Sequence, residues 1–276
     1  MTPRIECEVS GSVRRALTER VERSGSTLSD VVDTLLSEAL LLERHSLFQV
    51  STSNALVEGV FGGVTTVADL KRHGDFGLGT FAGLDGEMIM VEGECFRVTA
   101  GGLTTIAADD RATPFALVTR FSADLDADVH AVSLESLVAQ LDRLRPSENL
   151  FVGIRVDGVF DVLAMRAICA ARPGEGLVEA TSHQSEFEVV DVRGTIVGFW
   201  APEFAKSVSV TGYHFHFISA ERDTGGHVLG LEGRDLHLQV HTESDLHLAL
   251  PESVEFLTAD LSGDHEDVLD RAERAQ

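Results

Sequence analysis

The chain has 276 residues, of which 43% are hydrophobic, so it can form one large domain or two smaller ones with a sizeable core. Its formal charge of -23 argues against a nucleic-acid-binding surface, because phosphates would be repelled, and a small anionic substrate would need a local cation to hold it. The three cysteines form no C-x-x-C pair, and we find neither an apolar leader nor an apolar run of about 20 residues. We therefore expect a cytoplasmic protein with reduced thiols and no membrane contact.

Residues 1–45 predict one strand followed by two helices. The stretch IECEVS alternates apolar and polar side chains, which is typical of a short strand. The stretch SVRRALTERVERSG places three apolar residues on one helical face and ends at Gly25. A second helix is predicted in TLSDVVDTLLSEALLLE, where Thr27 and Asp30 form a T-x-x-D capping pattern.

This order resembles the ribbon-helix-helix fold, a small dimeric fold of many bacterial repressors that reads DNA through the outward side chains of its paired strand. Here those side chains would be Glu6, Glu8 and Ser10, and carboxylates facing phosphates have the wrong sign. Nearby arginines offset this charge only in part. We therefore expect residues 1–45 to be a dimerising segment of a homodimer or higher homo-oligomer, with DNA binding disfavoured. The alternative that these residues form an ordinary helical hairpin packed on the main domain remains.

From residue 46 onward, helices alternate with strands joined by turns. The stretch TTVADLKRHG predicts a helix capped by Thr65 or Thr66 and ended by Gly74. The stretch GEMIMVEGECFRVTA predicts a hairpin that turns at Glu92-Gly93. A further amphipathic helix is predicted in LESLVAQLDRLRP.

The second half of the chain is richer in strand patterns. The stretch NLFVGIRVDGVFDVLAMRAICAA predicts two strands joined at Asp157-Gly158, a typical hairpin dipeptide. Separate strands are predicted in EFEVVDVRGTIVGFWAPEF, SVSVTGYHFHFISA, GGHVLGLEG and DLHLQVHTES. Helices among hairpin-linked strands predict an α+β fold, with mixed or antiparallel sheets in two similar halves and a few helices.

Three histidines stand out in TGYHFHFISAERDTGGHVLG. His214 and His216 lie two apart on a predicted strand, so both face one side, while Phe215 and Phe217 face a core. His227 follows a connection long enough to bring the next strand alongside. Three imidazoles could then converge on one point, as a catalytic zinc or another late divalent metal requires.

Other interpretations of these histidines stay open on spacing alone. An H-x-H pattern is common by chance, and it also occurs in cupin-like metal-binding barrels. Three more histidines, His237, His241 and His247, alternate with leucines, and we expect them on the exposed face of a strand. The chain contains no G-x-S-x-G elbow, and GDFGLGTFAG lacks the spacing of a nucleotide-binding loop.

Longer motifs point to a known family. The ordered stretches HGDFGLGTF, LDGE, RGTIVGFWAP and GYHFHFISAERDTGGHV resemble the signatures of the α-acetolactate decarboxylases. The resemblance extends from about residue 46 to the C-terminus. The family's Asp-Arg pair in the last motif is Glu221-Arg222 here, a departure confined to a loop.

The resemblance implies conversion of 2-acetolactate to (R)-acetoin and carbon dioxide with a bound Zn2+. It implies that His214, His216 and His227 are the metal ligands. It also implies several active-site positions in this chain, namely Glu87, Arg166, a tail glutamate (Glu273, with Glu266 as the second choice) and the pocket-lining Thr80.

The chemistry of the residues agrees with this implication. Loss of carbon dioxide from a β-keto acid leaves electrons that a metal could stabilise as an enediolate, if it chelates the ketone and hydroxyl oxygens. Arg166 suits the carboxylate, and Glu87 suits delivery of a proton, although the final donor stays open between them. The alternative is a ribbon-helix-helix-linked, ligand-sensing regulator with a non-catalytic metal site.

Overall fold

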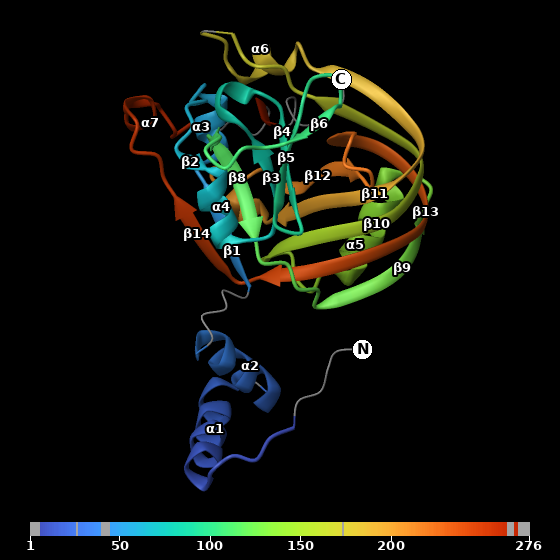
Figure 1. Ribbon diagram of the computed structural model, residues 1–276. Coiled ribbons are helices and arrows are strands. Elements are labelled where there is room, and N and C mark those ends of the chain that lie inside the picture. Colours follow the sequence, from blue (N-terminus) through green and yellow to red (C-terminus); the bar gives the residue numbers. More distant parts are fainter. Residues whose placement is uncertain (1–5, 26, 40–44, 173, 264–267, 270–276) are drawn as a thin grey trace. The chain divides into compact units, whose positions relative to one another are not determined.

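The computed structural model describes residues 6–25, 27–39, 45–172, 174–263 and 268–269 (Figure 1). The chain divides into two compact units, Met1–Arg44 and His45–Gln276. Among the described residues, no helix is both long enough and apolar enough to cross a membrane.

The first unit contains the two predicted helices, α1 (Gly11–Ser24) and α2 (Leu28–Ala39). The Ser10 hydroxyl accepts a hydrogen bond from Val13 N, and Gly25 ends α1 in the left-handed conformation with φ of 72°. The predicted strand is wrong for the part that the structure describes, because residues 6–10 form no strand. A lone segment of this length has no neighbouring strand to complete its backbone hydrogen bonds.

The second unit is built on two large sheets. The seven-stranded sheet has the order β14-β1-β8-β3-β4-β5-β6, and only its β1–β14 pair is parallel. Its strands are β1 (Ser46–Val50), β3 (Phe76–Thr80), β4 (Glu87–Val91), β5 (Glu94–Val98), β6 (Thr104–Ile106), β8 (Phe115–Thr119) and β14 (Asp245–Ala249). A separate small pair joins β2 (Thr65–Thr66) to β7 (Ala112–Thr113).

The five-stranded sheet is antiparallel and has the order β10-β11-β12-β13-β9. Its strands are β9 (Leu125–Ala131), β10 (Phe151–Ala167), β11 (Ser185–Ala201), β12 (Gly212–Ser219) and β13 (Gly225–Glu243). Because β10 also pairs with β13, four of these strands form a closed ring of pairings. The remaining helices are α3 (Ser53–Val57), α4 (Val67–His73), α5 (Leu134–Leu144), α6 (Leu177–Thr181) and α7 (Val254–Thr258), with 3-10 turns at Ala82–Leu84 and Glu203–Ala205.

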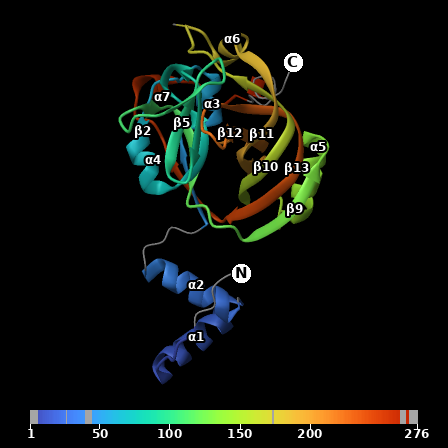
Figure 2. The ribbon, with the colours of Figure 1, turned by 45° about the vertical axis from the view of Figure 1, so that its right-hand side comes forward.

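The second unit is layered as helix, sheet, sheet and helix, which confirms the α+β prediction (Figures 1 and 2). Strand alternation sends Met88 and Met90 toward α4, and sends Ile89 toward the second sheet. On the other side, Leu137 and Leu141 of α5 pack against the outer face of the second sheet. The space between the sheets therefore holds a core of its own, and the site described below lies in it.

The capping signal of α4 and the turn signal between β4 and β5 agree with the structure. The Thr66 hydroxyl and the Asp69 carboxylate form a reciprocal capping box at the start of α4, and Gly74 follows its last residue. The β4–β5 hairpin turns at Glu92 and Gly93, which both have positive φ. These predicted boundaries are confirmed.

Two strand predictions are wrong in the same way, because β10 and β13 each run without a break. Asp157 lies inside β10, where its carboxylate accepts hydrogen bonds from Arg155 and from the Thr195 hydroxyl. A Cβ at Gly158 would lie 2.6 Å from Leu236 Cδ2, so this glycine permits close packing instead of a turn. Pairing with strands on both sides keeps β10 extended.

Candidate active site

The three histidines converge between the sheets, as the strand alternation predicts. His214 and His216 point from β12 toward the seven-stranded sheet, while Phe215 and Phe217 pack in the core under α5. His216 is the backbone partner of His227 on β13, so the hairpin brings the third ring to the first two.

The ring nitrogens of this triad are close together. His214 Nε2 lies 3.2 Å from His216 Nε2 and 3.1 Å from His227 Nδ1. The Nδ1 atom of His216 lies 2.8 Å from the Met88 carbonyl oxygen, so it carries the hydrogen and leaves the lone pair on Nε2. Burial, together with the Arg166 charge, lowers the pKa of His214 to about 3, so this ring is neutral at neutral pH.

These properties fit a metal ion. The three side chains form a group whose ligand atoms lie within 4.8 Å of one another. A tetrahedral zinc with bonds of about 2.05 Å to nitrogen separates neighbouring ligand atoms by about 3.3 Å, close to the spacing found here. The carbonyl behind His216 supplies the outer hydrogen bond that usually orients a metal-binding histidine.

Glu87 lies beside the triad at the start of β4. One of its carboxylate oxygens accepts a hydrogen bond of 3.2 Å from Ile168 N, and the other lies 3.6 Å from His216 Nε2. Thr80 is its direct partner on β3, and the Thr80 hydroxyl donates to the Gly86 carbonyl. The hydrogen bond from Thr80 to Gly86 fixes the turn before Glu87, and so directs Glu87 toward the three histidines.

Arg166 enters the site from β10, where it pairs with His227. Arg166 is 3% exposed, and its guanidinium donates from Nη1 to the Gln184 side-chain oxygen at 2.8 Å. Gln184 Nε2 in turn donates to Glu186. Sequence reasoning missed Gln184, because no motif surrounds it and its contact with Arg166 depends on the strand register.

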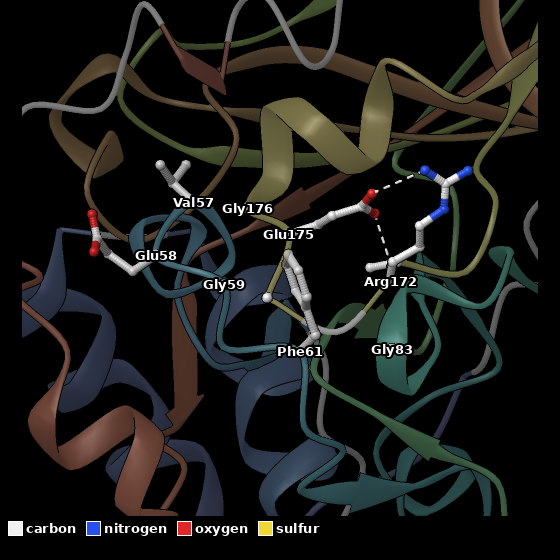
Figure 3. A pocket seen from close by; sticks show the side chains of 10 residues that line it. Val57, Glu58, Gly59, Phe61, Gly83, Arg172, Glu175 and Gly176 are labelled. Carbon is white, nitrogen blue, oxygen red and sulfur yellow. Dashed lines mark hydrogen bonds and ion pairs between the residues drawn. The ribbon is translucent and has the colours of Figure 1, made fainter.

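The polar groups surround a small buried pocket of about 50 Å3. Its polar lining consists of Thr80, Glu87, Arg166, Thr181, His214 and His227, and its apolar wall includes Leu56, Leu84 and Leu177. An outer pocket of about 500 Å3 is lined by the neighbouring residues Val57, Gly83 and Gly176 (Figure 3). Arg172 and Glu175 face each other there, with Arg172 N donating to the Glu175 carboxylate at 2.8 Å.

Other predicted residues have different outcomes. Glu266 and Glu273 lie outside the described residues, although the nearby Leu269 is buried in the same core cluster as the pocket residues Leu56 and Leu177. The prediction of an exposed position is wrong for His241, whose ring is 1% exposed because it faces the inter-sheet space. His247 is exposed and His237 is partly exposed.

Comparison with known proteins identifies the family. A family model described as alpha-acetolactate decarboxylase matches residues 47–263. An alpha-acetolactate decarboxylase of Methanosarcina mazei is 42% identical over 230 residues, covering 83% of this chain and 80% of the relative. One of Methylococcus capsulatus is 39% identical over 233 residues, covering 84% and 90%.

The fold agrees with these matches. The crystal structure of alpha-acetolactate decarboxylase from Bacillus subtilis superposes with a TM-score of 0.81 at 33% identity, covering 83% of this chain and all of that one. The chain therefore belongs to the alpha-acetolactate decarboxylase family of enzymes.

Proposed function

We propose that the chain converts 2-acetolactate to (R)-acetoin and carbon dioxide with Zn2+ held by His214, His216 and His227. The observation that carries this proposal is the convergence of the three imidazole rings, two of which line one buried pocket together with Glu87 and Arg166. A bound zinc would supply a Lewis acid for the ketone and hydroxyl oxygens of the substrate.

Arg166 would hold the substrate carboxylate. Its guanidinium keeps its charge and offers paired donors that match a carboxylate. Gln184 engages Nη1 and restricts the rotation of the guanidinium, which favours one orientation of the leaving group. A fixed carboxylate orientation matters, because the breaking carbon–carbon bond must lie perpendicular to the plane of the ketone for its electrons to reach the ketone oxygen.

Glu87 would move the proton. When the bond to the carboxyl carbon breaks, carbon dioxide leaves and the electron pair passes to the ketone oxygen. A proton must then reach one face of the former carboxyl-bearing carbon, and delivery from a fixed side chain gives one enantiomer. The hydrogen bond from Ile168 N fixes one Glu87 oxygen and leaves the other directed at the triad.

The two pockets suggest how the substrate reaches this site. The α6 helix contributes Leu177 to the wall of the inner pocket, and the residue before it, Gly176, lines the outer pocket. The substrate would therefore enter from the outer pocket, past the start of α6. We also propose that the first unit promotes self-association, since Val13, Leu28 and Leu36 are 45%, 55% and 52% exposed.

The direct test is to incubate the zinc-loaded protein with racemic 2-acetolactate. We expect release of carbon dioxide and formation of one acetoin enantiomer, measured by chiral gas chromatography. Racemic acetoin at the rate of the protein-free reaction would contradict the proposal.

A further inference from the structure

A second group of potential metal ligands lies near the opposite end of β13 from His227. His45, Asp124 and His241 each offer one ligand atom, and these atoms lie within 4.8 Å of one another. His241 is buried, whereas His45 and Asp124 have side chains that are 37% and 33% exposed. The group is therefore anchored in the protein and accessible to an ion from solvent.

The spacing within this group is too wide for hydrogen bonds. Asp124 Oδ2 lies 3.6 Å from His241 Nδ1 and 3.9 Å from His45 Nδ1, and charge pairs beyond about 3.5 Å are not hydrogen-bonded. Ligand atoms of one zinc ion are separated by about 3.3 Å in a tetrahedral site, so Asp124 Oδ2 and His241 Nδ1 are near coordination distance, and His45 would join them through Nε2 after a rotation of its ring. Among the described residues, the ion-pair partners of Asp124 are these two histidines.

The backbone around the group is held firmly. Thr242 N donates to Asp124 Oδ2 at 2.7 Å, and Asp124 N donates to the Val240 carbonyl. The His45 ring donates from Nδ1 to the Thr242 carbonyl at 2.6 Å, which leaves its lone pair on Nε2. His45 itself has a positive φ of 57°, and its carbonyl accepts from both Ser244 N and Asp245 N.

A buried carboxylate lies behind His241. Glu243 Oε1 is 3.6 Å from His241 Nε2, and the Glu243 side chain is fully buried. His241 thus has one ring nitrogen toward Asp124 and the other toward Glu243. At 3.6 Å the contact with Glu243 is also longer than a hydrogen bond.

We propose that His45, Asp124 and His241 bind a second divalent cation of the zinc class, distinct from the ion of the three-histidine site. Two histidines and one carboxylate form a donor set suited to zinc or another late first-row ion. The ion fastens the start of the second unit, just before β1, to the end of β13 and to the β8–β9 connection. Its role is to stabilise the fold, since none of its ligands lines the substrate pocket.

The test is equilibrium dialysis of the full-length, tag-free chain against Zn2+, followed by metal analysis. The wild-type protein is expected to retain two equivalents. His45→Ala and Asp124→Asn are each expected to retain one, with turnover of acetolactate unchanged. The asparagine keeps an oxygen for the Thr242 N–H bond, so it removes a charged ligand without breaking that contact.

His237→Ala is the matched control, because His237 lies on the same strand and also contacts a carboxylate, that of Asp128. It is expected to retain both equivalents. In a His216→Ala background, Zn2+ is expected to raise the melting temperature by a few degrees, and adding His45→Ala is expected to abolish that rise. A single equivalent in the wild type, or two equivalents in either ligand variant, would overturn the proposal without bearing on decarboxylation.

Discussion

The Glu87 carboxylate lies 3.6 Å from His216 Nε2, while its other oxygen is fixed by Ile168 N. The residue thus faces the proposed metal position without depending on the metal for its own orientation. Because Glu87 is held independently of the metal, its role in proton transfer can be tested apart from metal binding.

We predict that Glu87→Gln lowers kcat by about 10²–10⁴-fold, because an amide cannot transfer the proton. The amide oxygen can still accept the hydrogen bond from Ile168, so the fold and the zinc content should be retained. Steady-state kinetics on zinc-quantified protein would measure this effect. A kcat near that of the wild type would show that Glu87 is not the proton donor.

Arg166→Lys should raise KM by at least about tenfold, because an ammonium group cannot form the paired contact with a carboxylate. Arg172→Lys in the outer pocket is the control, since Arg172 is largely exposed and its side chain faces Glu175. Its KM should stay close to that of the wild type. Equal effects of the two changes would mean that general positive charge, and not the Arg166 geometry, holds the substrate.

The expected active-site role of a tail glutamate, Glu273 or Glu266, is better tested by point changes than by a truncation. A truncation that ends the chain just before Glu266 would also remove Leu269, which is buried in the same core cluster as residues of the pocket wall. We predict that Glu273→Gln lowers kcat more than Glu266→Gln, with both proteins keeping the thermal stability of the wild type. If neither substitution alters turnover, no tail glutamate takes part in the reaction.

Deleting residues 1–43 should reduce the assembly size and leave kcat/KM nearly unchanged. The second unit contains all the described pocket residues, and it begins at His45. Multi-angle light scattering of the full-length and shortened proteins gives the masses directly. An identical oligomeric state in both would show that the first unit has no dimerising role.

Local chemistry made part of the structure predictable from the sequence. The capping residues Thr66 and Asp69 set one end of α4, and the alternation within β12 put both histidines on one face. Such features depend on a few neighbouring residues. The folded structure keeps them because its tertiary contacts favour the same local conformations.

The features that were missed depend on contacts distant in the sequence. Asp157-Gly158 has the composition of a turn, yet strands on both sides hold it extended. His241 alternates with leucines as an exposed residue would, but Phe121 and His45 cover its ring. Gln184 contacts Arg166 only because of how β10 and β11 meet, and no local pattern encodes that register.

The central claim is that decarboxylation requires the metal of the three-histidine site. Zinc content and acetoin formation should be measured together in the wild type, in chelator-treated protein before and after zinc is restored, and in His216→Ala. We predict that His216→Ala loses one equivalent of zinc and all measurable turnover while keeping its circular dichroism spectrum, and that restored zinc revives only the chelated wild type. Full turnover in protein freed of metal would contradict the account.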